Sequence, residues 1–383
     1  MATDAQLARL GFIELDRAQR LLADDALRAV VAEDEAGILA SIGASADPDQ
    51  ALLLLGRFID ACDPARRRQV AGALAADPDL RGRLIDLLGV SAALGEFLVR
   101  QPAEWTALVD GERLGEAPSA SGTRDALLRA VGADPAHADP VAATDDAATL
   151  DALRIAYRRC LLGIAVRDLT GLAPMDAVGS WLADLADAVL EAAIAVARAG
   201  LPAAAAPCRF AVIGMGKCGG RELNYVSDVD VIFVAAAEEG EDEEAALRTA
   251  TQLATGLMRA CTTATAEGAI WEVDPNLRPE GRQGALVRTV SSHVGYYERW
   301  AKTWEFQALL KARPAAGDLA LGRAYVEAVA PFVWGAADHP TFVEDVQAMR
   351  RRVEEHVPAR IAERELKLGP GGLRDVEFSV QLL

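Results

Sequence analysis

The sequence predicts a mostly helical α+β protein in which a small α/β core is inserted among helices. Two observations lead to this fold class. Apolar residues recur at three-to-four spacing along most of the 383 residues, which is the period of an α-helix. Three short runs rich in β-branched and aromatic residues interrupt this pattern in the second half of the chain, which is typical of strands.

Residues 1–147 are predicted to form an N-terminal helical region that ends in a linker. Asp-Pro pairs divide its helical pattern into blocks, and this pair is typical of a helix start, with Asp as N-cap and Pro in the first turn. The predicted N-caps are Asp47, Asp63 and Asp77. A tract rich in Gly, Pro, Ser and Asp follows at about residues 111–147, broken only by a short helix around Leu127–Val131.

Residues 148–290 are predicted to combine a helical lead-in with the α/β core. Two long amphipathic helices are expected at about 148–169 and 175–199, because Gly200 and Pro202 close the second one. Three acids interrupt its apolar stretch: Asp184, Asp187 and Glu191.

The core itself is predicted from three strand-like runs and one helix. The runs are Arg209–Ile213, Asp230–Val234 and Ala269–Asp274, and a helix from about Glu243 to Cys261 separates the second from the third. Residues 291–383 are expected to return to helix, apart from a glycine break at 369–372. Because the chain stops in the middle of an apparent helix, we expect it to be truncated from a longer polypeptide.

The composition excludes several classes of function. The chain carries 39 Lys+Arg against 57 Asp+Glu, a net charge of −18, which argues against nonspecific nucleic-acid binding and against docking on anionic membranes. No segment supplies the ~20 consecutive apolar residues of a membrane span. The five cysteines form no C-x-x-C pair, and the start lacks the pattern of a signal peptide. We therefore expect a cytoplasmic protein with neither nucleic acid nor membrane as a partner.

The segment from Phe210 to Val234 carries the most chemical information. Its first glycines match the G-x-G-x-x-G pattern of dinucleotide-binding folds, which place an acidic residue about 20 residues further on, at the far end of the next strand. Here only about eight residues separate Gly219 from Asp228, and the acid precedes the strand. The spacing therefore disfavours a dinucleotide site.

The acids of this segment indicate a metal site instead. Asp228 and Asp230 are separated by one residue, so both carboxylates face the same side of a strand. Paired carboxylates hold Mg²⁺ together with substrate phosphates. A third acid is expected from the neighbouring strand, where Glu272 and Asp274 alternate with apolar residues, and Asp274 is favoured because it lies nearer the strand end. Asp228, Asp230 and Asp274 are thus the predicted catalytic residues and metal ligands.

Residues around the acids are predicted to bind phosphate. Glycines allow backbone N–H groups to approach phosphate oxygens, and cationic side chains nearby would neutralise them. The predicted nucleotide- and phosphate-binding residues are Gly216, Lys217, Gly219, Gly220, Ser227 and Arg278. Arg282, Lys311 and Arg313 are further candidates, the last two on a predicted helix where a solvated face is the usual alternative. Trp300 and Trp304 are expected to belong to the core.

The order of the motifs resembles a known family. The run GMGKCGGRELNYVSDVD at 214–230, DPNLRP at 274–279, KAR at 311–313 and KLGPGGLRDVEF at 367–378 follow the pattern of the glutamine synthetase adenylyltransferase/adenylyl-removing enzymes. These are a branch of the polymerase-beta-type nucleotidyltransferases. The resemblance covers about Leu150 to Leu383. It departs from the family pattern at Cys218, where an aliphatic residue is usual, and at Asn276, where Arg is common.

The resemblance implies a fold, an activity and partners. It implies a polymerase-beta-type core that uses Mg²⁺, in a family with two catalytic domains in tandem. One adds AMP from ATP to a tyrosine of glutamine synthetase, and the other removes it by phosphorolysis with orthophosphate, releasing ADP. About 200 residues precede a single copy of the motif, and the 367–378 segment is similar to the removing half, so we expect the adenylyl-removing, N-terminal half. Glutamine synthetase and a PII-type signalling protein are the implied partners.

Two alternatives to this function stay open. The same fold could perform the opposite transfer of AMP from ATP, or the chain could be a non-catalytic module that senses a nucleotide or a signal protein. The three acids favour a catalytic role over the sensing module.

Overall fold

The computed structural model describes residues 2–382, with the side chains of residues 112, 113 and 363 left aside. It confirms a mostly helical α+β fold that contains a small mixed sheet. The chain forms two compact units, Met1–Thr123 with Ile155–Trp181 and Arg124–Arg154 with Leu182–Leu383. The three-part division of the sequence at residues 147 and 290 stays a prediction.

The first unit is helical. Its elements, the last of which continue into the second unit, are α1 Asp4–Arg9, α2 Leu15–Ala23, α3 Asp25–Val31, α4 Glu35–Ala44, α5 Pro48–Ala61, α6 Pro64–Ala76, α7 Pro78–Val90, α8 Ala92–Arg100, η1 Pro102–Leu108, α9 Gly111–Gly115, α10 Ala120–Ala130, α11 Ala147–Leu169 and α12 Met175–Ala199. The predicted caps are confirmed, because Asp47, Asp63 and Asp77 accept hydrogen bonds from first-turn amides of α5, α6 and α7. Buried apolar residues of α1 to α9, η1 and α11 form one continuous core.

The second unit holds the sheet. Its elements are β1 Cys208–Gly214, α13 Gly216–Gly219, β2 Val229–Ala237, α14 Glu243–Thr262, β3 Val273–Asp274, η2 Gly281–Gln283, β4 Val287–Arg288, α15 Val290–Tyr297, α16 Thr303–Leu309, β5 Arg313–Gly317, α17 Leu319–Gly335, η3 Ala336–Asp338, α18 Phe342–Glu355, η4 Ala362–Arg364 and α19 Leu373–Gln381. The predicted long helices correspond to α11, α12 and α14. The short helix expected around Leu127–Val131 is longer, since α10 begins at Ala120.

The sheet has the order β3-β2-β1-β5, and β4 also pairs with β2. β1 is antiparallel to β2 and β5, whereas β3 and β4 run parallel to β2. The expectation that the chain after Val290 is helical throughout is wrong at β5. This segment of Pro and small residues lacks the strand pattern, and it is extended because it pairs with β1, for example Val212 with Ala316.

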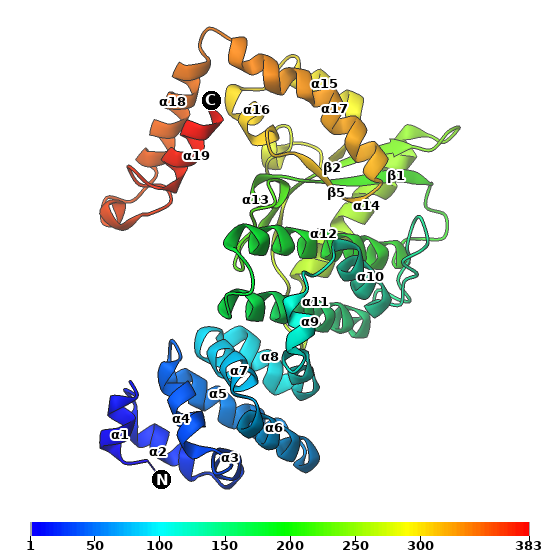
Figure 1. Cartoon of the computed structure of the whole chain (residues 1–383). Coiled ribbons are helices and arrows are strands. Elements are labelled where there is room, and N and C mark those ends of the chain that lie inside the picture. The colour runs from blue at the N-terminus through cyan, green and yellow to red at the C-terminus, as the bar shows by residue number, and fades with distance from the viewer. Residues whose placement is uncertain (1, 383) are drawn as a thin grey trace. The chain divides into compact units, whose positions relative to one another are not determined.

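Helices cover both faces of the sheet (Figure 1). Side chains alternate across a strand, so Ile213 and Ile232 face one side, where they pack with Leu321 and Tyr325 of α17. The rings of Phe210 and Phe233 stack at 5.7 Å on the other side, which α12 and α14 cover. The strand ends that carry the predicted site are therefore held between two packed layers.

The surface differs from the sequence-based expectation at one tryptophan. Trp300 is 72% exposed, so it does not belong to the core, whereas Trp304 is partly buried.

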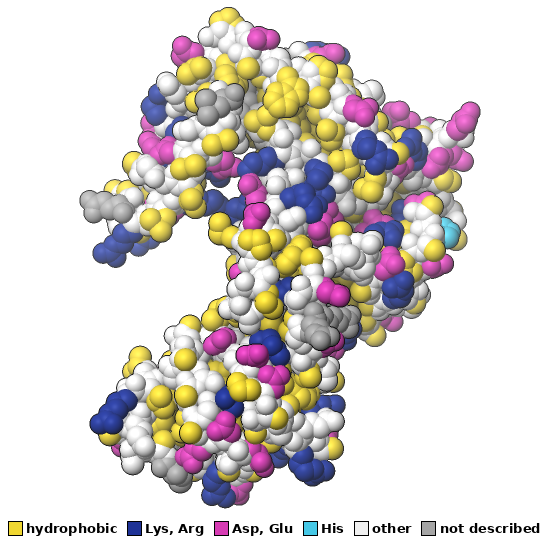
Figure 2. Space-filling model, in the orientation of Figure 1, with side chains coloured by type: hydrophobic (Ala, Val, Ile, Leu, Met, Phe, Trp, Pro, Cys, Tyr) yellow, Lys and Arg dark blue, Asp and Glu magenta, His cyan; other side chains and the backbone are white. Residues whose placement is uncertain are grey.

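On the face drawn in Figure 2, the described acidic and basic side chains are interspersed. Among residues 2–382, no helix combines the length and the apolar character that crossing a bilayer requires.

Candidate active site

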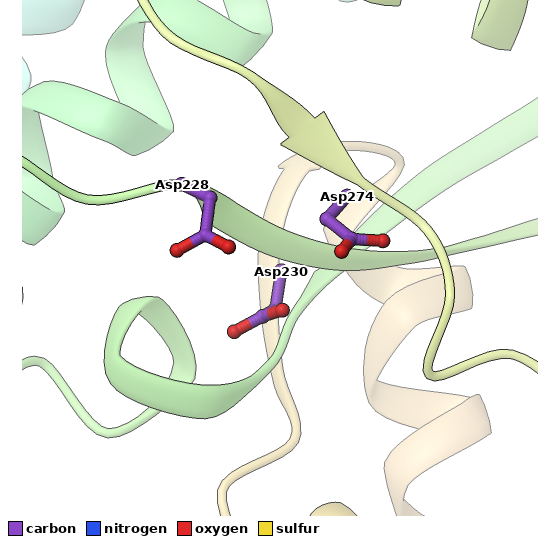
Figure 3. Close-up of side chains that lie close together, drawn as sticks. All are labelled: Asp228, Asp230 and Asp274. Atoms are coloured by element: carbon purple, nitrogen blue, oxygen red, sulfur yellow. The ribbon is translucent and has the colours of Figure 1, made fainter. Parts of the chain in front are cut away.

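Three carboxylates meet at one end of the sheet (Figure 3). Asp230 of β2 is the register partner of Asp274 in the parallel strand β3, and Asp228 lies two residues before Asp230 on the same face. Each side chain offers an oxygen within 4.8 Å of the oxygens offered by the other two. The alternative third acid, Glu272, is exposed and lies outside this cluster.

The backbone around the carboxylates fixes their positions. One oxygen of Asp274 accepts a hydrogen bond of 2.7 Å from the amide of Asn276. Because the donor is a backbone amide, the Asn side chain at this position does not affect it. The hydroxyl of Ser227 lies 3.5 Å from Asp228, at the outer limit of a hydrogen bond.

The environment of Asp230 disfavours an uncompensated negative charge. Burial raises the pKa of Asp230 to about 6, and repulsion from Asp228 and Asp274 contributes to the rise, while Lys217 and Lys367 oppose it. Close carboxylates repel one another unless a cation neutralises them. Three carboxylate oxygens at this spacing form a hard donor set of the kind that divalent cations such as Mg²⁺ prefer. The residues therefore fit a divalent metal ion.

Residues 215–228, which we call the glycine loop, lead from β1 through the short turn α13 to the carboxylates. Gly216 has φ of +51°, and a Cβ at this position would lie 2.4 Å from a carboxylate oxygen of Asp230. A Cβ at Gly219 would lie 2.0 Å from the carbonyl oxygen of Lys311. Both positions therefore require glycine for close packing.

The amides of the loop divide into two groups. Those of Gly219 and Gly220 donate to the carbonyls of Met215 and Gly216 at 2.8 and 3.0 Å. The sequence predicts that these two amides approach phosphate oxygens. In the structure they are hydrogen-bonded within the loop instead. Within the part of the chain that the structure describes, the amides of Gly216 and Lys217 make no backbone hydrogen bond.

The predicted phosphate-binding cations have different surroundings. Lys217 donates to the side-chain oxygen of Asn224 at 2.9 Å. Arg278 uses Nε and Nη1 to hold its own loop, through the carbonyls of Gly284 and Pro275 at 3.2 and 2.9 Å. Only Nη2 of this guanidinium has no hydrogen bond to the residues of the described chain. Arg282 is exposed at the surface of the same loop.

Arg313 anchors the glycine loop from behind. It is the first residue of β5, whereas the sequence predicts that it lies on a helix; that prediction is wrong. Its guanidinium binds both oxygens of Asp187 on α12, at 2.6 and 3.0 Å, and donates to the carbonyls of Cys218 and Gly219 at 3.1 and 3.3 Å. Burial raises the pKa of Asp187 to about 6, and Arg313 limits this rise, so the carboxylate is ionised at neutral pH.

Asp184, Asp187 and Glu191 of α12 together make an anchoring face. They recur at helical spacing and therefore point to one side of the helix. Asp184 pairs with Arg221 of the glycine loop at 2.8 Å, and Glu191 accepts the amide of Gly317 in β5 at 2.7 Å. Acids at this spacing in an otherwise apolar helix were the signal that could have revealed these contacts.

The C-terminal segment also returns to the site. Lys311, one of the candidate phosphate ligands, instead bridges Glu222 of the glycine loop and Glu377 of α19, the latter at 3.2 Å. The charge of Lys367, just before α19, opposes the rise in the pKa of Asp230. Glycines at 369–372 marked this segment in the sequence, but nothing local indicated where it lies.

Comparisons with known proteins identify the family. The profile of the glutamate-ammonia ligase adenylyltransferase family matches residues 81–328, and that of the GlnD PII-uridylyltransferase matches residues 346–383. Curated relatives named bifunctional glutamine synthetase adenylyltransferase/adenylyl-removing enzyme include proteins of Streptomyces avermitilis, 53% identical over 383 residues, and Mycolicibacterium smegmatis, 48% identical over 361 residues.

These matches cover nearly all of the chain but only part of each relative. They include 100% and 92% of this chain, and 36% and 34% of the two relatives. The chain thus spans about 36% of the length of the Streptomyces relative. On these matches, the chain belongs to the glutamate-ammonia ligase adenylyltransferase family.

Proposed function

We propose that this chain is the adenylyl-removing domain, which deadenylylates glutamine synthetase by Mg²⁺-dependent phosphorolysis. The observation that carries the proposal is the cluster of three carboxylates beside a glycine loop, in a chain whose relatives are named for both addition and removal of adenylyl groups. The match to the N-terminal part of those relatives supports the removing direction, together with the resemblance of the 367–378 segment.

Asp228, Asp230 and Asp274 would hold one or two Mg²⁺ ions. When bound, Mg²⁺ would neutralise charge on the phosphate oxygens and on the leaving tyrosine oxygen. The register of β2 and β3 sets the spacing of these ligands before any substrate arrives, because Asp230 and Asp274 are neighbours in the sheet. The carboxylates are therefore preorganised.

The chain's own cations would bind and orient the reacting phosphates. An oxygen of orthophosphate forms a bond to the AMP phosphorus, and the bond from that phosphorus to the tyrosine oxygen breaks. The electron pair leaves with the phenolate, which takes a proton from solvent, and the product is ADP. The pKa of a tyrosine phenol, about 10, makes it an acceptable leaving group once its charge is stabilised. Lys217 and Nη2 of Arg278 are the groups that we assign to the phosphate oxygens.

Product analysis tests the proposal. The purified chain is incubated with AMP-modified glutamine synthetase, orthophosphate and Mg²⁺, and the nucleotide products are separated. We expect ADP, formed only when phosphate is present. Incorporation of AMP from ATP without ADP release would show the opposite transfer. If neither reaction occurs, the non-catalytic sensing module remains as the alternative function.

Two matched variants connect the reaction to the carboxylates. Asp228→Asn removes one member of the cluster, whereas Glu272→Gln removes an exposed acid of the same region that lies outside it. We expect Asp228→Asn to abolish ADP release and Glu272→Gln to retain it. Equal activity of the two variants would contradict a metal role for the cluster.

The protein partners belong to the same proposal. We assign glutamine synthetase as the substrate because the relatives' names refer to it. A PII-type signalling protein is proposed as a regulatory partner, and its support is the match of residues 346–383 to a PII-uridylyltransferase.

A further inference from the structure

The chain uses lysine at very few positions. Arginine supplies 35 of its 39 basic residues, and the remaining four are Lys217, Lys302, Lys311 and Lys367. Three of these four surround the glycine loop and the carboxylates beside it. Lys217 follows Gly216, which packs against Asp230, Lys311 pairs with Glu222 of the same loop, and Lys367, in the segment before α19, acts on the charge of Asp230. A lysine ammonium is a compact point charge that can also bind phosphate, whereas the planar fork of arginine suits bidentate pairs with carboxylate or phosphate. The concentration of lysine at one place therefore indicates a ligand that a point charge binds well.

The three lysines differ in how far their charges are already used. Lys311 lies between two glutamates, Glu222 and Glu377, and acts as a strut between the glycine loop and α19. Lys217 is hydrogen-bonded to Asn224. In contrast, the side chain of Lys367 makes no hydrogen bond or ion pair to any residue that the structure describes, although it lies in the field of Asp230.

The backbone that carries Lys367 is firmly held. Its amide donates to Glu365 at 3.1 Å, and its carbonyl accepts the amide of Arg374 in α19 at 2.9 Å. Arg350 of α18 donates to the carbonyls of Leu368 and Gly369 at 3.1 and 2.9 Å.

The strut from Lys311 to Glu377 then ties α19 to the glycine loop. An exposed, uncommitted ammonium is thus presented at the cluster by a fixed loop.

The similarity of this segment to another enzyme narrows its role. Residues 346–383 match a uridylyltransferase of PII, whereas residues 81–328 match an adenylyltransferase of glutamate-ammonia ligase. By their names, these enzymes differ in the transferred base and in the protein that is modified. What they share is the transfer of a nucleotidyl phosphate. A segment common to both is therefore suited to contact phosphate more than base or protein.

We infer that Lys367 binds an oxygen of the reacting phosphates, so that the loop at 365–372 completes the active site from the C-terminal side. This inference rests on the proposed function for the identity of the substrate. The ligand class is a tetrahedral phosphate oxyanion, either the incoming orthophosphate or the phosphate of the nucleotide. Lys217 approaches the same carboxylates from the glycine loop, so the two lysines would share the charge of the phosphates.

Steady-state kinetics of variants tests this role in the whole chain. Lys367→Met removes the charge, Lys367→Arg keeps it, and Lys302→Met removes the one lysine outside the site. With AMP-modified glutamine synthetase, Mg²⁺ and varied orthophosphate, we expect Lys367→Met to lose about ten- to a hundredfold in kcat/KM, as for a charged hydrogen bond. Lys367→Arg should recover part of this loss, and Lys302→Met should behave as the unmodified chain.

The parameter that changes identifies the phosphate. A raised KM for orthophosphate assigns Lys367 to the attacking phosphate, and a raised KM for the modified protein assigns it to the nucleotide. Unchanged kinetics in Lys367→Met would overturn the inference. Thermal unfolding of each variant controls for folding, and Lys367→Gln provides a second neutral variant if the Met variant unfolds early.

A calorimetric measurement separates this inference from the proposed function. Binding of ADP with Mg²⁺ does not require turnover, and we expect Lys367→Met to bind about tenfold more weakly than Lys302→Met. If the unmodified chain releases no ADP in the assay but loses ADP affinity in Lys367→Met, the proposed function fails and the role of Lys367 stands. Equal ADP affinity in the two variants, or no ADP binding by the unmodified chain, would refute the role of Lys367.

Discussion

Removal of Arg313 should uncouple the glycine loop from the helix behind it. The guanidinium makes a two-pronged ion pair with Asp187 and also holds the carbonyls of Cys218 and Gly219. In Arg313→Met, the carboxylate of Asp187 stays in place without its partner, and two loop carbonyls lose their donors. The variant therefore tests how much of the site depends on a contact that touches no substrate.

The magnitude follows from the burial of the pair. Breaking a fully buried ion pair costs about 3–5 kcal/mol. Here the side chains of Arg313 and Asp187 are 23% and 18% exposed, so water offsets part of this cost. We expect a loss of about 2–3 kcal/mol in the free energy of unfolding at neutral pH.

The loss should depend on pH in a defined direction. With Arg313 in place, burial already raises the pKa of Asp187 to about 6, from 3.8. Without the arginine, the pKa of Asp187 rises further, so the folded state takes up a proton more readily than the unfolded state. Acidification then favours folding, and the destabilisation should be smaller at pH 5 than at pH 8.

Urea unfolding at both pH values measures this, with Arg209→Met as the matched control. Arg209 pairs with Asp318 in the same unit, but the two side chains are 39% and 26% exposed, so its loss should cost no more than about 1 kcal/mol. In the double variant Asp187→Leu/Arg313→Met, most of the stability should return, because no buried charge remains. Its activity should stay low, since the loop carbonyls are still unheld. If Arg313→Met is as stable and as active as Arg209→Met, the reasoning is refuted.

Three further outcomes are expected. Gly216→Ala forces a Cβ against Asp230 at a backbone with φ of +51°, so it should destabilise the chain by about 1–3 kcal/mol and abolish activity. Gly72→Ala, in an open helical position, should instead stabilise it by about 0.5–1 kcal/mol, and urea unfolding that gives both variants the same sign would contradict this argument. Mg²⁺ should raise the midpoint of thermal unfolding of the unmodified chain and of Glu272→Gln but not of Asp230→Asn, and an equal rise in all three would exclude the carboxylates as the metal site. Burial lowers the pKa of His293 to about 4 from 6.5, so the unfolded state binds the proton first as pH falls and stability is lost between these values, by about 2 kcal/mol at pH 5. His293→Gln should flatten that dependence in urea unfolding at pH 7 and pH 5, and an unchanged slope would show that another group is responsible.

The sequence by itself determined the local elements and the chemistry of the acids. Helical periodicity and Asp-Pro starts are decided within a few residues, which is why α5, α6 and α7 begin where their caps predict. The spacing of Asp228 and Asp230 likewise fixes a shared face, because side chains alternate along a strand.

Contacts between distant segments were decided only by the tertiary structure. Whether Glu272 or Asp274 joins the cluster depends on the register between β2 and β3. Arg313 lies in a strand because β1 offers it hydrogen-bond partners, not because its own sequence favours one.

The position of Lys367 beside Asp230 has the same origin. Nothing within a few residues of this lysine specifies its distance from the carboxylates. That distance follows from the packing of α18 and α19 and from the strut that Lys311 forms between the glycine loop and Glu377. The spacing of residue types along the sequence reports only interactions between near neighbours. The completed site depends on strand pairs and ion pairs between distant segments, which form only when the whole unit has folded.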